Sequence, residues 1–120
     1  MPPVELVLDS DPAAALKTIR AASDQRPVLV LKHSPICPVS ARAERQVELW
    51  IAGLENGDEP GLARIDVIAE RTLARGLTSE LGIRHESPQA LWFRGGGLIW
   101  HGSHGDITRE RCDELLRAHG

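Results

Sequence analysis

A short apolar run, Val28 to Leu31, and the Cys37-Pro38 pair that follows it constrain the fold more than any other part of the sequence. Four consecutive apolar residues that include β-branched valines are typical of a strand covered on both faces of a sheet. Pro38 suits the first turn of a helix, where its missing N–H has no partner to lose. These residues predict a buried strand that leads into a helix with a cysteine at its start.

The predicted helix that begins at Pro38 has one apolar face. Its apolar residues recur mostly in steps of three or four, which matches the period of an α-helix. Gly53 and the polar segment 56–61 then predict the end of the helix and a loop. The residues of the apolar face are Val39, Ala43, Val47, Trp50, Ile51 and Leu54.

The rest of the chain also alternates between apolar runs of strand length and longer segments with helical spacing, and no internal repeat interrupts this order. The glycines 95–97 predict a hairpin turn; a phosphate-binding loop is disfavoured, because such a loop should open a helix. The other expected elements are a strand from Val4 to Leu8, a helix near Pro12 to Ala22 capped by Ser10 or Asp9, a strand from Leu62 to Ile68, a helix from Arg71 to Leu81 ended by Gly82, strands at Gln89 to Phe93 and Leu98 to His101, and a last helix from about Ile107 to Ala118 with Asp106 or Thr108 near its start.

This order of elements predicts an α/β fold. Strands that alternate with helices require crossover connections and a largely parallel sheet, while the terminal hairpin adds antiparallel strands. We therefore expect a mixed central sheet of four to five strands with helices on both faces. A chain of 120 residues can bury a core of its own, so we expect a single domain over residues 1–120.

Charge and cysteine content argue against several classes of protein. A formal charge of −3 is too mild to suggest a protein that binds nucleic acid or a membrane surface. No apolar run approaches the ~20 residues of a membrane helix, and the segment from Met1 to Glu5 lacks the regions of a signal peptide. Cys37 and Cys112 are too few for a disulfide-rich scaffold and too far apart for a CxxC zinc site. We expect a cytoplasmic protein.

Cys37 is the most informative single residue. At the start of a helix, backbone N–H groups and the helix dipole favour the thiolate, which is the form that attacks disulfides. The alternative is an inert buried cysteine, but the polar residues Lys32, His33 and Ser34 at the end of the preceding strand argue against it. The sequence therefore predicts a reactive thiol at Cys37.

Four motifs, in the right order, resemble one known family. A strand, Cys-Pro-x-x and a helix, with Ser87-Pro88 later leading into a glycine hairpin, are similar to the thioredoxin fold, and the detailed motifs resemble the YtxJ-type monothiol bacilliredoxins. The resemblance covers nearly the whole chain, with Pro35-Ile36 as its departure. The motifs are Lys32-His33-Ser34, Cys37-Pro38-Val39-Ser40, His85-Glu86-Ser87-Pro88-Gln89 and Trp100-His101-Gly102-Ser103-His104, and Arg71 falls at a matching position.

The resemblance implies thiol–disulfide exchange with bacillithiol, a cysteine-containing thiol that bears glucosamine and malate. Cys37 would attack a mixed disulfide between bacillithiol and a cytosolic protein, take over the bacillithiol and release the protein thiol. Ser40 takes the position of a dithiol enzyme's resolving cysteine, and its hydroxyl cannot complete the exchange. Leu31 stands where thioredoxins usually carry a buried acid, which fits a monothiol cycle. Bacillithiol would then be a co-substrate, with no bound cofactor, and another bacilliredoxin or a reductase would be a partner.

The resemblance also implies a set of binding residues. In thioredoxin-like proteins the proline at Pro88 is cis and lies against the active cysteine, so it would present the Ser87 backbone to a substrate cysteine. The histidines of the motifs are expected at the rim of the site, with ordinary surface histidines as the alternative. These candidates are His33, His85 and His104. The cations Lys32, Arg71 and Arg84 are candidate partners of the malate carboxylates, with a solvated charge or a structural ion pair as the alternative for each, and Glu86 is a candidate partner of one of them.

Cys112 leaves two interpretations open. It shares a helical face with Leu115, Leu116 and His119, and this spacing predicts a buried core residue. The other interpretation is a distal resolving thiol, which would make the catalytic cycle of Cys37 intramolecular.

Two further alternatives concern the whole protein. One is an iron–sulfur carrier similar to monothiol glutaredoxins, although Pro38 and the lack of a Cys-Gly-Phe-Ser motif count against it. The other is a thioredoxin-like interaction module with no redox role. His101 and His104 have a spacing that suits zinc but lack a credible third and fourth ligand, so no metal site is expected.

Overall fold

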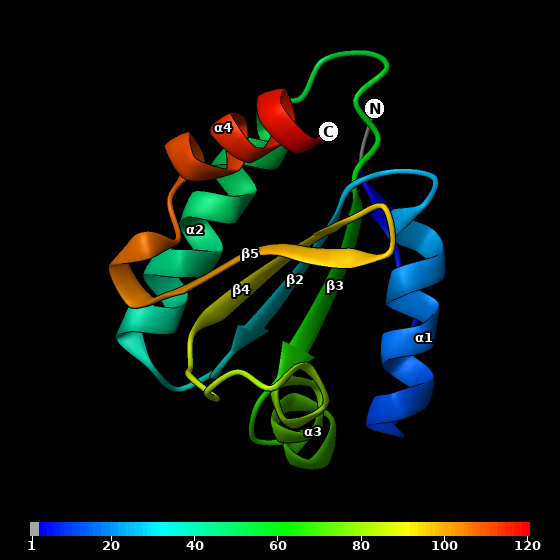
Figure 1. Ribbon diagram of the computed structural model, residues 1–120. Coiled ribbons are helices and arrows are strands. Elements are labelled where there is room, and N and C mark those ends of the chain that lie inside the picture. Colours follow the sequence, from blue (N-terminus) through cyan, green and yellow to red (C-terminus); the bar gives the residue numbers. More distant parts are fainter. Residues whose placement is uncertain (1–2) are drawn as a thin grey trace.

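The computed structural model describes residues 3–120, and these form a mixed five-stranded sheet (Figure 1). Met1 and Pro2, the first residues of the expected domain and of the segment analysed for a signal peptide, lie outside the described residues. The strands are β1 Val4–Glu5, β2 Val28–His33, β3 Gly61–Asp66, β4 Gln89–Arg94 and β5 Gly97–Ser103. Their order in the sheet is β1-β3-β2-β4-β5, in which β1, β3 and β2 are parallel, β4 is antiparallel to β2, and β5 is antiparallel to β4.

Helices cover both faces of this sheet, which confirms the predicted α/β class. On one face lie α1, Pro12–Ser23, and α3, Arg71–Leu81. On the other face lie α2, Pro38–Ala52, and α4, Arg109–His119 (Figure 1). A short 3-10 helix, η1 at His104–Asp106, joins β5 to α4.

β2 lies at the centre of the sheet and is buried on both faces, as its apolar run predicts. Val28 and Val30 join the core under α1 and α3, whereas Leu29 and Leu31 join the core under α2 and α4, because successive side chains of a strand point to opposite faces. The carboxyl ends of β2 and β3 and the start of β4 meet at one edge of the sheet (Figure 1). The chain passes from this edge into α2, so the fold places the start of α2 there.

Several strands differ from their predicted bounds. β1 stops well short of Leu8, because its ladder with β3 pairs only two residues. β3 ends at Asp66, before Ile68, because the Asp66 carboxylate accepts the N–H groups of Ile68 at 2.8 Å and Ala69 at 3.0 Å and so forms a turn. β5 continues to Ser103, and β2 continues beyond its apolar run.

Two helix starts also differ from prediction. The cap of α1 is Asp11, not Ser10 or Asp9, because the Asp11 carboxylate accepts an N–H of the first turn at 3.0 Å. The last helix starts slightly later than Ile107: Thr108, one of the two residues expected near its start, caps its first turn through its hydroxyl, and η1 occupies residues shortly before it.

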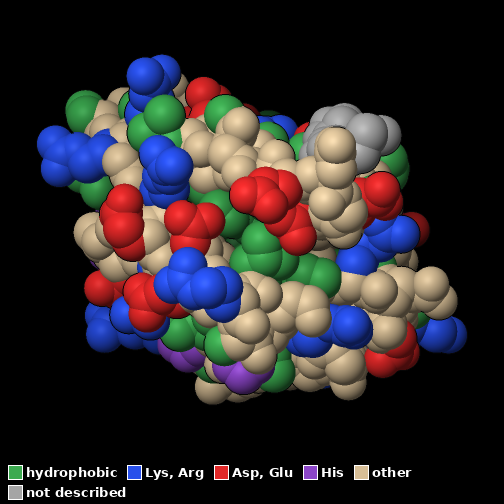
Figure 2. All heavy atoms as spheres, turned by 90° about the horizontal axis from the view of Figure 1, so that it is seen from above, with side chains coloured by type: hydrophobic (Ala, Val, Ile, Leu, Met, Phe, Trp, Pro, Cys, Tyr) green, Lys and Arg blue, Asp and Glu red, His purple; other side chains and the backbone are tan. Residues whose placement is uncertain are grey.

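The surface of the molecule carries charges of both signs. On the face shown in Figure 2, basic and acidic side chains are interspersed. No helix in the described range 3–120 is long and apolar enough to cross a membrane.

Candidate active site

Cys37 is the N-cap residue of α2, at the sheet edge where β2 ends. Its backbone is extended, and its carbonyl accepts the N–H of Ala41 at 3.0 Å, which starts the hydrogen bonding of the helix. The N–H of Cys37 donates to the carbonyl of Ser34 at 3.4 Å and closes the turn between strand and helix. The thiol is free and partly exposed, so a substrate can reach it.

The first turn of α2 lowers the pKa of Cys37. The backbone N–H of Ser40 and then that of Val39 are the main causes, because they hydrogen-bond the sulfur and stabilise the thiolate. Partial desolvation opposes the shift, and the Ser40 hydroxyl adds to it. Pro38 at the first helical position has no N–H, so the acidifying amides belong to the two residues after it. The start of α2 therefore favours the nucleophilic form of Cys37.

Ser40 has a role that the sequence did not reveal. Its side chain is fully buried, and its Oγ accepts the N–H of Ser34 at 2.9 Å. The same hydroxyl hydrogen-bonds Cys37 and lowers the pKa of the thiol. Ser40 thus holds the turn before the helix and stabilises the thiolate, in addition to taking the place where a second thiol would stand.

The Ser87-Pro88 peptide bond is cis, as the resemblance implies. Pro88 immediately precedes β4, whose first residue pairs with Lys32 near the end of β2, so the cis proline lies at the same sheet edge as the start of α2. Its carbonyl accepts the N–H of His104 at 3.2 Å, which ties η1 to this loop. The Ser87 hydroxyl is buried and has no hydrogen-bond partner among the described residues.

Lys32 lies near the end of β2, as the sequence suggested, but it is buried and does not form a polar strand exit. Its side chain is 0% exposed. Its Nζ donates to His85 Nδ1 at 2.7 Å and to Gln89 Oε1 at 2.8 Å. Burial lowers the pKa of Lys32 to about 8, with the nearby Arg75 charge as a second cause. The amine is therefore not a free cation for a substrate carboxylate, and it is not among the groups that lower the pKa of Cys37.

The remaining candidates lie around these residues with different exposures. His33 Nδ1 is 3.6 Å from a Glu44 carboxylate oxygen and has no hydrogen-bond partner in the described chain. Arg84 forms an ion pair with Glu86 at 3.4 Å, as one interpretation of the sequence expected. Arg71 is exposed at the start of α3, close enough to His85 for its charge to help lower the pKa of that imidazole, after burial and Lys32.

A groove of about 290 Å³ adjoins the start of α2, between this helix and the segment from η1 to α4. Its walls include Val39, Arg42 and Gln46 from one face of α2 and His104 from η1. His104 is exposed and has a positive φ of 50°. The sequence analysis missed Arg42 and Gln46; their spacing of three and seven residues from Val39 is the signal that places them on one helix face.

Cys112 occupies a different environment. It is 2% exposed and packs in the core under α2 and α4. Leu115 is also buried there, whereas Leu116 is only partly buried. Burial, with the charge of the neighbouring Asp113 carboxylate as a second cause, raises the pKa of the Cys112 thiol to about 12. Cys112 is therefore a protonated core thiol at neutral pH.

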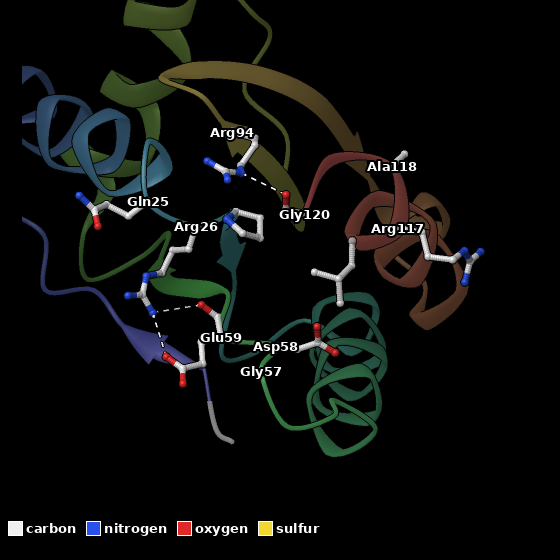
Figure 3. A pocket seen from close by; sticks show the side chains of 11 residues that line it. Gln25, Arg26, Gly57, Asp58, Glu59, Arg94, Arg117, Ala118 and Gly120 are labelled. Atoms are coloured by element: carbon white, nitrogen blue, oxygen red, sulfur yellow. Dashed lines mark hydrogen bonds and ion pairs between the residues drawn. The ribbon is translucent and has the colours of Figure 1, made fainter.

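A larger cavity of about 580 Å³ lies at the other end of the sheet (Figure 3). It is lined by residues just before β2, at the end of β4 and at the end of α4, so it does not adjoin Cys37. Two of its arginines already have partners: Arg94 donates to the carbonyls of Ser23, at 2.9 Å, and Gly120, at 3.3 Å, and Arg26 pairs with Glu59 at 3.5 Å. Within residues 3–120, no three His, Cys, Asp or Glu side chains gather in a way that could hold a metal ion.

Comparisons with known proteins agree with this geometry. The monothiol bacilliredoxin family BrxC matches residues 11–112. A solved structure described as having a thioredoxin fold is 32% identical, with a TM-score of 0.71, and the match covers 92% of this chain and 90% of that one. Fasciola hepatica thioredoxin, at 15% identity, has a TM-score of 0.66 over 98% of this chain and 99% of its own. A mutant thioredoxin from Halobacterium salinarum, at 19% identity, has a TM-score of 0.67 over 98% and 90%. The chain has the thioredoxin fold and belongs to the monothiol bacilliredoxin family.

Proposed function

We propose that this protein removes bacillithiol from mixed disulfides on cytosolic proteins, with Cys37 as the nucleophile. One observation carries the proposal: an accessible thiol of lowered pKa stands at the start of α2, and a serine occupies the place of a second thiol. A thiolate is needed for the attack. Ser40 cannot form a disulfide, so the product of the attack persists until a thiol from solution arrives.

The exchange needs no net oxidation or reduction. The Cys37 thiolate attacks the bacillithiol sulfur of the mixed disulfide, a new sulfur–sulfur bond forms, and the client protein leaves as a thiolate that takes a proton from water. A second thiol, from free bacillithiol or from a partner redoxin or reductase, then attacks the bacillithiol sulfur of the Cys37 disulfide. A disulfide between this thiol and bacillithiol forms, and Cys37 leaves as the restored thiolate. Bacillithiol is a co-substrate in this scheme, and no bound cofactor takes part.

The cis-Pro88 loop and the start of α2 form the proposed docking surface. In this proposal the Ser87 backbone pairs with an extended client segment. Ile36, with 81% of its surface exposed, and Val39, with 40%, offer apolar contacts beside Cys37. His33, Ser34, His85, His104 and Arg71 complete the proposed active-site rim.

Transfer from a bacillithiolated client protein tests the proposal. The Cys112→Ser variant, with Cys37 as its only thiol, is mixed with the client without oxygen and analysed by mass spectrometry. We expect one bacillithiol on Cys37 and one free thiol on the client. A client carrying glutathione in place of bacillithiol is the matched control and should react more slowly. Equal rates with the two clients would mean that the protein acts on mixed disulfides of low-molecular-weight thiols in general and not on those of bacillithiol in particular. No transfer from either client would refute the proposal.

A further inference from the structure

Lys32 is one of only two lysines in the chain, and it is fully buried. A charged amine is rarely buried unless it is paired, because removal from water is costly. Here the amine donates to His85 Nδ1 at 2.7 Å and to Gln89 Oε1 at 2.8 Å. Both partners flank the Ser87-Pro88 bond, so the contacts of this lysine point to the loop that contains the cis proline.

Gln89 extends the contact from Lys32 to the backbone of that loop. It lies directly opposite Lys32 in the antiparallel pairing of β2 and β4. Its Oε1 also accepts the N–H of Glu86 at 3.3 Å, and its Nε2 donates to the carbonyl of Arg84 at 3.0 Å. The segment before Ser87 belongs to no helix or strand, so these side-chain bonds take the place of regular backbone pairing.

We propose that Lys32 is a positioning residue that holds the 84–88 segment, through His85 and Gln89, in the geometry that receives a substrate cysteine. The proposal rests on the proposed docking role of the cis-Pro88 loop. It does not require the client to carry bacillithiol.

The charges around Lys32 fit this role. The groups that face the amine and its imidazole partner are Arg75 and Arg71 from α3 and Glu86 from the loop. Burial, the Lys32 charge and the two arginines lower the pKa of His85, which favours the neutral imidazole. The amine of Lys32 has only protons to donate, and it therefore matches an unprotonated Nδ1.

Lys32 and the nucleophile can be perturbed separately. The pKa of Cys37 is set by the first turn of α2 and the Ser40 hydroxyl, with no contribution from Lys32. A variant that loses the Lys32 amine should therefore keep the reactivity of Cys37 toward small disulfides. It should lose only the part of the reaction that needs an ordered docking loop.

The test compares Lys32→Met, which keeps an unbranched side chain, with Lys17→Met, which removes the exposed lysine of α1. All proteins carry Cys112→Ser. The thiol of Cys37 is challenged with 5,5′-dithiobis(2-nitrobenzoic acid) and with a cysteine peptide whose thiol carries thionitrobenzoate. We expect Lys32→Met to slow the peptide reaction about tenfold, mainly by raising the half-saturating peptide concentration. The reaction with the small disulfide and its pH midpoint should not change, and Lys17→Met should match the parent in both reactions.

Two spectroscopic readouts need no substrate, so they distinguish failure of this inference from failure of the proposed function. The ¹⁵N shifts of His85 should show a proton on Nε2 alone in the parent and a mixture of tautomers in Lys32→Met. Hydrogen exchange at the Glu86 amide should be at least about tenfold faster in that variant. If Lys32→Met reacted with the peptide as fast as the parent, the proposal would be overturned. The same would hold if the peptide reaction were slower but the His85 tautomer and the hydrogen exchange at the Glu86 amide were unchanged.

A second variant guards against misfolding of Lys32→Met. Gln89→Leu retains the lysine and removes the bonds to Arg84 and Glu86, and it should reproduce the slow peptide reaction. In the Lys32→Met/Gln89→Leu double variant the two losses should be far from additive, because both act on one loop. Additive losses would mean that Lys32 and Gln89 act independently and would overturn the proposal.

Discussion

The two cysteines carry the same chemical group and differ in every property that decides reactivity. Cys37 precedes α2, is partly exposed and has a lowered pKa, whereas Cys112 lies inside α4, is 2% exposed and has a pKa raised to about 12. The sulfur of Cys37 accepts hydrogen bonds from backbone amides of the first helical turn, whereas Cys112 packs against apolar side chains. The difference shows that position relative to the first turn of a helix, together with burial, sets the chemistry of each thiol.

Removal of each sulfur in turn is the strongest test of this comparison. We expect Cys37→Ser to abolish bacillithiol transfer, because no other exposed thiol exists in the described chain to make the attack. Cys112→Ser should retain the parental transfer rate. The measurement is release of the client thiol over time. Loss of transfer in Cys112→Ser, together with a peptide linking Cys37 to Cys112 in the oxidised parent, would make Cys112 a resolving residue.

Alkylation measures the same difference without a substrate. At pH 7 we expect iodoacetamide to modify Cys37 at least about 100-fold faster than Cys112, because thiolate fraction and access both favour Cys37. The rate at Cys37 should rise with pH and level off at a midpoint below the ordinary thiol pKa of 9.0, since its pKa is lowered. Peptide mapping of a time course gives both rates. A midpoint at or above the ordinary value would show that the start of α2 does not acidify Cys37.

Introduction of a second thiol beside Cys37 sharpens the contrast. In Ser40→Cys the new thiol lies one helical turn from Cys37, and we expect an intramolecular disulfide to form after reaction with oxidised bacillithiol. The yield of the mixed disulfide between Cys37 and bacillithiol should fall severalfold, because the new thiol displaces bacillithiol and forms the intramolecular disulfide. Ser40→Ala is the matched control: it removes the same hydroxyl without adding a thiol, so it should keep the adduct. An adduct of equal yield in both variants would contradict the monothiol interpretation of Ser40.

The smallest expected effect concerns the stability contributed by Cys112. At pH 7 we expect Cys112→Ala to lower the free energy of unfolding by about 1 kcal/mol, through lost apolar burial. Above pH 9 the unfolded parent loses the Cys112 proton while the folded parent retains it, so the parent is destabilised by about 1.4 kcal/mol at pH 10. The two proteins should therefore reach similar stability near pH 10. Urea unfolding at both pH values measures this, and a difference that does not depend on pH would argue against a buried Cys112.

Most of the fold follows from the sequence because local signals and burial agree. The helix Arg71–Leu81 has its predicted bounds, since Gly82 adopts a positive φ of 69° and ends it. The glycines of the β4–β5 turn also have positive φ values, as a hairpin requires. The start of α2 is predicted because Pro38 and the apolar spacing after it identify the same residue.

The candidate site is less predictable, because its contacts join distant parts of the chain. Lys32 and His85 are 53 residues apart, and the burial of a lysine opposes the usual preference of that residue for water. The double role of Ser40 depends on the turn that brings Ser34 back to it, and the groove beside Cys37 exists only where η1 meets α2. No pattern in the sequence specifies these encounters before the sheet is assembled.

The acidity of Cys37 depends mainly on backbone amides, and this has an evolutionary consequence. A side-chain substitution near the thiol leaves those amides in place, unless it introduces a proline at Val39 or Ser40. The neighbouring surface residues Pro35 and Ile36 are then free to diversify without loss of the nucleophile. The choice of client protein can therefore change during evolution independently of the reactivity of Cys37. A lineage can acquire new targets while its reaction stays the same.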